Sequence, residues 1–297
     1  MKEKYRLNEN LVDDFVENRE RLNQIVLDRA DNVIKRFYSL DSQVYRDSTL
    51  SSKVKEMLGL VSSLVLRCDD CVKYHLNQCF ENKVTTGEII EVLSVGLVVG
   101  GSIVIPHLRR AMEFWTALEK KRFDKLYMEI KKEFELRLYN LKKDNNANNN
   151  QKISNSEKAN EEVKLKDDLL KFICNVCSKN IPYYNWFGFY LVDNENKNLL
   201  NLGPFVGEET EHTKIPFGRG ICGQAAEKMH TIIVDDISEE KNYLACSLKV
   251  KSELVTPILR GDKVLGEIDI DSHYLNAFSQ LDKEFIEKLA NLVEPIL

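Results

Sequence analysis

The feature that most constrains the fold is a polar stretch in the middle of the chain, KKDNNANNNQKISNSEKANEEV, residues 142–163. It carries almost no apolar side chains, so it cannot bury enough surface to offset the entropy lost when a chain becomes ordered. A chain of 297 residues has about the length of two domains. The sequence therefore predicts one domain at 1–141, a flexible Asn-rich linker at 142–163 and a second domain at 164–297.

The first domain has the pattern of an all-α fold. Apolar residues recur at spacings of three and four along residues 11–40, a segment without Pro or Gly, which predicts a helix there. Ser51 or Ser52 is a candidate N-cap for the next helix. Thr85 and Glu88 have the spacing of a capping box. A last long helix is expected from about His107 to Leu141.

The second domain changes to a pattern of short strands. Segments rich in β-branched and aromatic residues, separated by Asn, Gly and Asp, predict strands at 186–193, 199–205, 231–237, 252–261 and 263–272. Amphipathic or glycine-entered helices are expected at 165–181, 218–229 and 278–297, the last with Ser279 as its cap. This alternation indicates an α+β domain with one antiparallel sheet and helices packed against it.

Charge and hydropathy exclude several classes of function. The formal net charge of −5 argues against a nucleic-acid-binding surface, which is usually basic. No apolar run reaches the roughly 20 residues that span a bilayer, and the start of the chain lacks the apolar core of a signal peptide. We therefore expect a cytoplasmic protein that neither crosses a membrane nor binds nucleic acid. In that compartment its seven cysteines are expected to be thiols rather than a structural disulfide framework.

A group of carboxylates lies in the last predicted hairpin. Asp269 and Asp271 are two residues apart on one strand, so both point to the same face of the sheet. Glu253 begins the partner strand and is positioned to lie opposite them. The group has two interpretations: the carboxylates lie in water at the strand ends, or they form a site for an ammonium group or a metal, because clustered buried carboxylates repel one another. No His or Cys spacing nearby favours a metal, and none is predicted.

Two cysteines lie near this hairpin in the sequence. Cys246 precedes Glu253 by seven residues, in a predicted loop. Cys222 lies in GRGICG at a helix start, where the helix N-terminus favours a thiolate. A single cysteine is more often an inert buried residue, and that interpretation remains open for each of them.

The motifs of the second domain resemble the free methionine-(R)-sulfoxide reductase family of GAF domains. The resemblance covers most of 164–297 and includes NWFGFYL, LGPFVG, IPFGRGICGQAA, the spacing from Cys246 to Glu253, and GEIDIDS. It implies that Cys246 is the attacking thiolate. It also implies that Glu253, Asp269 and Asp271 hold the ammonium group of free methionine sulfoxide and protonate the departing oxygen.

The same resemblance implies further parts of the site. Trp186 and Tyr190 would form the wall of the substrate pocket, and Cys222 would be a second catalytic thiol. No bound cofactor is implied, because reducing equivalents would come from a thioredoxin-like protein or another thiol donor. The family usually has a third cysteine before the IPFGRG segment, and this chain has His212 at that position. If the chain is active, another thiol must then resolve oxidised Cys246.

A second group of redox-type residues lies in the helical domain. Cys68, Cys71 and His75 occupy positions i, i+3 and i+7 of one helix face, and Glu56 lies twelve residues upstream of Cys68. The alternatives are a pair of core cysteines with a hydrogen-bonded histidine, or a zinc site for which only three soft ligands are evident.

This spacing resembles the alkylhydroperoxidase D-like carboxymuconolactone decarboxylase family over about residues 30–120. The resemblance implies that Cys71 is the attacking thiol, Cys68 its partner, and Glu56 and His75 the proton relay. Redox members often have a His between the two cysteines, where this chain has Asp70. The family also tends to assemble, so a homo-oligomer through the N-terminal domain is expected.

Two hypotheses connect the halves of the chain. In the first, the Cys68/Cys71 dithiol reduces oxidised Cys246 across the linker. In the second, the GAF domain is a non-catalytic amino-acid sensor that regulates an N-terminal alkyl hydroperoxidase. A further pair, Cys174 and Cys177, lies on an amphipathic helix, where packing is favoured over function.

Overall fold

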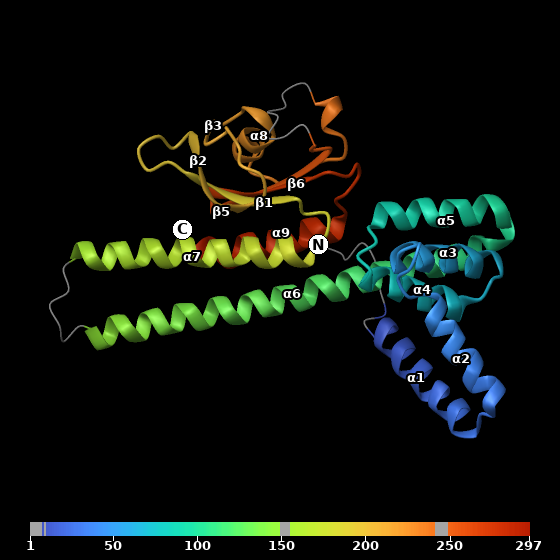
Figure 1. Ribbon diagram of the computed structural model, residues 1–297. Coiled ribbons are helices and arrows are strands. Elements are labelled where there is room, and N and C mark those ends of the chain that lie inside the picture. Colours follow the sequence, from blue (N-terminus) through green and yellow to red (C-terminus); the bar gives the residue numbers. More distant parts are fainter. Residues whose placement is uncertain (1–7, 9, 149–154, 241–248) are drawn as a thin grey trace. The chain divides into compact units, whose positions relative to one another are not determined.

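The computed structural model describes residue 8 and residues 10–148, 155–240 and 249–297. The chain divides into two compact units, Met1–Arg122 and Phe123–Leu297 (Figure 1). The first is helical and the second is α+β with an antiparallel sheet, so the predicted fold classes are confirmed. Among the described residues, no helix combines the length and apolar character needed to span a bilayer.

The first unit is built from helices of moderate length. They are α1 (Leu11–Arg29), α2 (Asn32–Val44), α3 (Ser52–Val65), α4 (Asp69–Glu81), α5 (Thr86–Gly100), a short 3-10 turn (Ser102–Val104) and the first part of α6 (Ile105–Asn148). The predicted caps are confirmed: the Ser51 hydroxyl accepts from the Val54 N–H, and Thr85 and Glu88 form a reciprocal capping box.

The predicted continuous helix over 11–40 is wrong, because it divides into α1 and α2. Ala30 adopts an extended backbone, and the Asp31 carboxylate accepts hydrogen bonds from the N–H groups of Val33 and Ile34. An Asp can offer its side chain to the backbone in this way and start a new helix, even where no Pro or Gly breaks the pattern.

The segment 142–163 also differs from the predicted flexible linker. Helix α6 continues to Asn148 and α7 begins at Asn155, so only 149–154 lie outside the described residues. Two long helices flank the segment, and adding residues to an existing helix avoids the cost of nucleation. The division between the units falls within α6, because Phe123, Ile130 and Phe134 of that helix are buried in the core of the second unit.

The second unit contains a six-stranded antiparallel sheet in the order β3-β2-β1-β6-β5-β4. The strands are β1 (Trp186–Val192), β2 (Leu199–Val206), β3 (Lys214–Pro216), β4 (Ile232–Val234), β5 (Ser252–Arg260) and β6 (Lys263–Ser272). Five of them were predicted. The three-residue strand β3 was missed, because so short a segment carries no readable alternation and forms only by pairing with β2.

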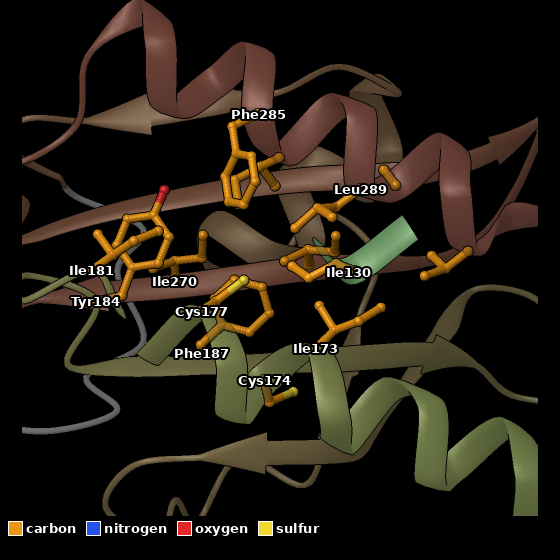
Figure 2. Close-up of a cluster of buried hydrophobic side chains, with 14 of the residues drawn as sticks. Ile130, Ile173, Cys174, Cys177, Ile181, Tyr184, Phe187, Ile270, Phe285 and Leu289 are labelled. Carbon is orange, nitrogen blue, oxygen red and sulfur yellow. The ribbon is translucent and has the colours of Figure 1, made fainter. Parts of the chain in front are cut away.

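Each face of the sheet has its own apolar core. Helices α7 (Asn155–Asn180) and α9 (Gln280–Val293) cover one face, and α8 (Gly220–Lys228) covers the other (Figure 1). The first core includes Phe187, Ile270 and Phe285 (Figure 2). The second includes Trp186 and Tyr190. The candidate site residues of this unit lie on that second face, which α8 covers.

Asp282 anchors α9 to the strand that enters the site. Its Oδ1 accepts hydrogen bonds from the Tyr183 and Tyr184 hydroxyls at 2.8 and 2.9 Å. Its Oδ2 accepts from the Ser279 backbone N–H and hydroxyl at 2.8 and 2.7 Å, completing the predicted Ser279 cap. The two tyrosines lie just before β1, so this buried carboxyl fixes where β1 begins relative to α9.

We expect Asp282→Ala to lower the free energy of unfolding of the second unit by about 2–3 kcal/mol, since it removes a helix cap and the hydrogen bonds that two buried tyrosine hydroxyls donate to this carboxyl. Urea unfolding followed by Trp186 fluorescence, in a Trp115→Phe background, measures this. Asp168→Ala on the exposed side of α7 is the matched control and should change the value by less than about 0.5 kcal/mol. Equal values for the two variants would contradict this role of Asp282.

Candidate functional sites

The sheet register gathers four carboxyl groups on the face beneath α8. Asp271 pairs with Glu253 on β5 and with Trp186 on β1, while Asp269 pairs with Val255 and Gly188. Glu267, two residues before Asp269, pairs with Tyr190. Directly paired residues share a face, and so do residues two apart, so all four carboxyls point to one side. Glu267 was missed in the sequence, although the same alternation that relates Asp269 to Asp271 places it there.

The four carboxyls are buried, which rules out the interpretation that they lie in water. Glu253 is 4% exposed, Glu267 0%, and Asp269 and Asp271 1% each. Both side-chain oxygens of Glu267, and the Oδ1 atoms of Asp269 and Asp271, have no hydrogen-bond partner among the described residues. Buried polar atoms are usually satisfied, so these unpaired oxygens make the cluster a candidate binding site.

Burial and mutual repulsion make these groups weaker acids. Burial raises the pKa of Asp269 to about 7. Burial, followed by the charge of Asp269, raises the pKa of Glu267 and of Asp271 well above their ordinary values, and the same effects act on Glu253. Like charges this close cannot all ionise, so some of the group stays protonated near neutral pH. The cluster can therefore both attract a cation and donate a proton.

Helix α8 brings a thiol to this cluster. Cys222 is its third residue and is buried, and its thiol donates to Oε1 of Glu253 at 3.9 Å. The Cys222 sulfur and one oxygen each of Glu253 and Asp269 all lie within 4.8 Å of one another. The glycine-entered helix makes this approach possible, because Gly223 lies 2.4 Å, measured from an added Cβ, from the Pro216 carbonyl oxygen. Any larger residue there would push α8 away.

Two aromatic residues form the wall beside the carboxyls. The Trp186 ring stacks on Phe205 with centroids 5.4 Å apart and lies 6.3 Å from the Tyr190 ring. The Trp186 N–H donates to the Glu208 carbonyl, and the Tyr190 hydroxyl donates to the His212 carbonyl at 2.8 Å. Because Tyr190 bonds to the backbone of residue 212, the residue type at that position does not alter this contact.

Cys246, the predicted attacking thiolate, lies outside the described residues. The described residues resume at Lys249. A cavity of about 20 Å³, room for about one water molecule, lies between Trp186, Val250, Asp271 and His273. Val250, just before β5, therefore lies near the end of the cluster formed by Asp271.

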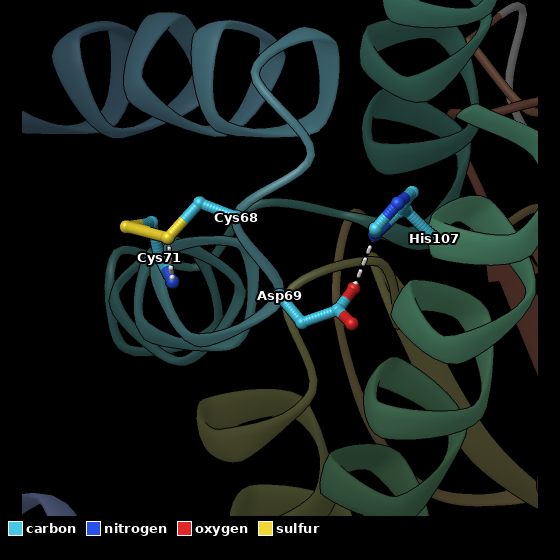
Figure 3. Close-up of a disulfide and its surroundings, with 4 residues drawn as sticks. All are labelled: Cys68, Asp69, Cys71 and His107. Atoms are coloured by element: carbon cyan, nitrogen blue, oxygen red, sulfur yellow. Dashed lines mark hydrogen bonds and ion pairs between the residues drawn. A yellow bond between two sulfur atoms is a disulfide. The ribbon is translucent and has the colours of Figure 1, made fainter. Parts of the chain in front are cut away.

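A separate site lies in the helical unit at the start of α4. Cys68 is the N-cap of this helix and Cys71 lies in its first turn, and the two form a disulfide (Figure 3). The Cys68 sulfur accepts a hydrogen bond from the Cys71 backbone N–H at 3.4 Å. A sulfur at a helix N-terminus is stabilised as a thiolate when the pair is reduced. The predicted dithiol pair is thus close enough to react reversibly.

His75, one turn beyond Cys71 on α4, forms a buried pair with Glu56 of α3. His75 Nδ1 lies 2.7 Å from Glu56 Oε2, and both side chains are nearly inaccessible. The His75 ring packs against Gly59 of α3, where an added Cβ would lie 2.5 Å from a ring atom. The predicted relay residues Glu56 and His75 are therefore in direct contact, and His75 faces Cys71 across one helical turn.

The structure adds a pair of residues that the sequence did not reveal. Asp69, next to Cys68, lies 2.7 Å from Nδ1 of His107 (Figure 3). It also lies 2.9 Å from Nε of Arg110, and both partners are on α6. Partial burial by itself raises the pKa of Asp69, but the hydrogen bonds from His107 and Arg110 outweigh it and lower that pKa. No local pattern relates residues 69 and 107. Asp70, which lies between the two cysteines in the sequence, is exposed.

Cys174 and Cys177 are buried in the core beneath the sheet (Figure 2). Burial raises the pKa of both thiols far above the ordinary value. The prediction that this second C-x-x-C pair serves packing is confirmed.

Comparisons with known proteins agree with this division of the chain. Residues 166–297 match the GAF domain family, and residues 32–114 match the carboxymuconolactone decarboxylase family. The free methionine-R-sulfoxide reductase of Saccharomyces cerevisiae is 39% identical over 140 residues, which are 43% of this chain and 77% of that protein. The chain belongs to the free methionine-R-sulfoxide reductase family.

Solved structures resemble each part of this family member. The free methionine-R-sulfoxide reductase of Neisseria meningitidis, solved in complex with its substrate, is 35% identical over 44% of this chain and 77% of its own, with a TM-score of 0.42. A carboxymuconolactone decarboxylase family protein of Thermotoga maritima is 54% identical over 35% of this chain and 89% of its own, with a TM-score of 0.35. The two resemblances inferred from the motifs are confirmed at the level of the family by the two family matches and by the identity to the Saccharomyces cerevisiae reductase.

Proposed function

We propose that the GAF unit reduces free L-methionine-(R)-sulfoxide to methionine. The observation that carries this proposal is a set of four buried carboxyls beside a thiol and two aromatic rings: Glu253, Glu267, Asp269 and Asp271. Glu267, Asp269 and Asp271 each have at least one oxygen without a hydrogen-bond partner among the described residues. Membership of the reductase family supports the same substrate.

The proposed reaction divides into two steps that the residue types can perform. The Cys246 thiolate attacks the sulfoxide sulfur while a protonated carboxyl of the cluster gives its proton to the sulfoxide oxygen. The hydroxyl group then moves from the substrate sulfur to the Cys246 sulfur while the bond between the two sulfurs breaks. Methionine leaves, and Cys246 becomes a sulfenic acid. A second thiol then attacks the sulfenic sulfur, which releases water and leaves a disulfide. Because His212 replaces the usual cysteine, this second thiol is Cys222, another thiol of the chain or an external donor.

The carboxyl cluster also accounts for a preference for the free amino acid. An ammonium group of free methionine sulfoxide supplies the positive charge that the carboxyls lack. A methionine sulfoxide residue within a peptide chain has no such group, and binding it would leave the carboxyls desolvated and unpaired.

The test is turnover of free methionine-(R)-sulfoxide by the full chain with dithiothreitol as reductant. We expect formation of methionine from the (R) diastereomer, none from the (S) diastereomer, and none with Cys246→Ser, the matched control. Equal turnover by the parent and by Cys246→Ser would overturn the proposal.

We further propose that the Cys68/Cys71 dithiol passes reducing equivalents to the GAF unit, with a thioredoxin-like protein or another thiol as the external donor. The disulfide-forming pair and the Glu56–His75 contact support a redox role for this site. The double variant Cys68→Ser/Cys71→Ser should recycle oxidised Cys246 more slowly than the parent with the same donor. Equal rates would exclude the transfer.

Glu56 orients His75, and its replacement is expected to slow oxidation of the dithiol. We expect Glu56→Gln to lower the rate at which an organic hydroperoxide oxidises reduced Cys71 by about 10–100-fold, because the neutral amide removes the negative charge that would stabilise a positively charged imidazole during proton transfer. Rapid quenching followed by thiol titration measures the rate. Glu91→Gln on the exposed side of α5 should leave it unchanged. A Glu56→Gln rate equal to the parent rate would exclude a relay through this pair.

A second candidate function follows from that same N-terminal geometry. The helical unit would be an alkyl hydroperoxidase, and the GAF unit a sensor that keeps its amino-acid pocket without turnover. Peroxide consumption that depends on Cys71, together with absence of sulfoxide turnover, would favour this candidate.

We also propose that the helical unit forms a homo-oligomer. Helix α2 has no buried residue, and its Val33, Phe37 and Val44 side chains are exposed. Light scattering of the full chain measures the assembly, and a strictly monomeric mass at micromolar concentration would exclude it.

A further inference from the structure

The thiol of Cys222 and the carboxyls of Glu253 and Asp269 form a ligand set that the sequence did not reveal. One atom of each lies within 4.8 Å of the other two, and the Cys222–Glu253 separation is 3.9 Å. The three residues come from α8, β5 and β6, so only the packing of α8 on the sheet brings them together.

The spacing suits a small divalent cation. Zinc is bound by sulfur at about 2.3 Å and by carboxylate oxygen at about 2.0–2.2 Å, which places neighbouring ligand atoms roughly 3.5 Å apart. The ligand atoms now lie within 4.8 Å of one another, so they would have to approach by about one ångström to reach that spacing.

A second observation indicates that nothing described balances the negative charge of the carboxylates around these three residues. Both oxygens of Glu267 are fully buried and have no hydrogen-bond partner among the described residues, and Glu267 is not one of the three ligands. Asp269 is 1% exposed and has one oxygen bonded to nothing described. A divalent ion would balance these carboxylates, and Glu267 and Asp271 would supply negative charge around it.

We propose that Cys222, Glu253 and Asp269 bind a Zn²⁺ ion. The thiol selects a thiophilic ion such as Zn²⁺ over Mg²⁺ or Ca²⁺, which prefer oxygen ligands alone. Binding releases the thiol proton, because the thiolate is the form that ligates metal. Three protein ligands leave a fourth position open to solvent or to a bound molecule. The ion occupies the same carboxyls as an ammonium group, so Zn²⁺ and a free amino acid exclude each other.

The experiment measures Zn²⁺ affinity of the full chain by competition with a chromophoric chelator. The parent for all variants carries Cys68→Ser and Cys71→Ser, so that the N-terminal dithiol cannot bind the metal. We expect one Zn²⁺ per chain. Cys222→Ser and Asp269→Asn should each weaken binding by more than about 100-fold, since loss even of an outer partner costs 10–100-fold. The matched control, Cys174→Ala, should leave the affinity unchanged.

The Zn²⁺ affinities are measured without sulfoxide turnover, so failure of the zinc site can be distinguished from failure of the proposed reductase activity. Unchanged affinity in Cys222→Ser, or binding lost only with Cys246→Ser, would overturn the assignment. If Cys222→Ser fails to fold, Co²⁺ added to the parent reports the site: a thiolate-to-metal absorption band is expected, and its absence would overturn the proposal. Mg²⁺ at the same concentration should not displace Zn²⁺, and displacement would show that the thiol is not a ligand.

Discussion

Asp269→Asn is expected to stabilise the second unit at neutral and alkaline pH. The amide keeps the shape of the carboxyl and removes a buried group whose neighbours repel its charge. Burial raises the pKa of Asp269 to about 7 from 3.8. Three pKa units correspond to a difference in the free energy of unfolding on the order of 4 kcal/mol above pH 7.

The pH dependence gives the sign of this effect. Below pH 4, Asp269 is protonated in both the folded and the unfolded chain, so the variant and the parent should be equally stable. Between pH 4 and pH 7 the unfolded chain loses the proton while the folded chain keeps it, so the parent becomes progressively less stable as the pH rises. Above pH 7 the difference stays constant.

Urea unfolding at several pH values, followed by Trp186 fluorescence in a Trp115→Phe background, measures this difference. Asp168→Asn on the exposed side of α7 is the control and should follow the parent at every pH. A stability gain in Asp269→Asn that is the same at pH 4 and pH 8 would show that charge burial is not its cause.

Glu253→Gln is expected to lower the activity towards free methionine-(R)-sulfoxide. Glu253 lies opposite Asp271 and accepts from Cys222, at the point where α8 meets the sheet. Removing one partner of a buried charge pair costs about 2–5 kcal/mol, which corresponds to a decrease in kcat/KM for free methionine-(R)-sulfoxide of roughly 30- to 5,000-fold.

Steady-state kinetics with dithiothreitol measure this loss. Glu227→Gln, on the exposed side of α8, is the matched control and should keep the parent value. The second unit should remain folded in both variants, because Glu253→Gln also relieves repulsion. A fully folded Glu253→Gln variant with unchanged kcat/KM would exclude Glu253 from substrate binding.

The parts of the site that depend on local pattern could be predicted. The shared face of Asp269 and Asp271 follows from strand alternation alone, and the position of Glu253 follows from the hairpin that joins β5 to β6. The position of Cys68 at a helix start and the Ser279 cap can likewise be predicted from short segments of sequence. These features need no knowledge of distant packing.

The remaining parts depend on contacts between distant segments. The approach of Cys222 to the carboxyls requires α8 to pack on the sheet, and the Asp69–His107 contact requires α6 to lie beside α4. The helical ends on both sides of 149–154 arise by extension of α6 and α7. The polar, Asn-rich composition of 142–163 predicted a flexible linker there instead. Glu267 is different, because the alternation that identified Asp269 and Asp271 contains it as well.

The central claim is that buried carboxyls on β5 and β6 recognise the ammonium group of a free amino acid. The most direct measurement is the ratio of kcat/KM for methionine-(R)-sulfoxide to that for its N-acetyl derivative, in the parent and in Glu253→Gln. A site built to pair a polar group rejects an analogue without it by about 10⁴-fold, so a ratio of that order is expected in the parent and a much smaller one in the variant. A parent ratio near one, or a large ratio that Glu253→Gln leaves intact, would contradict the claim.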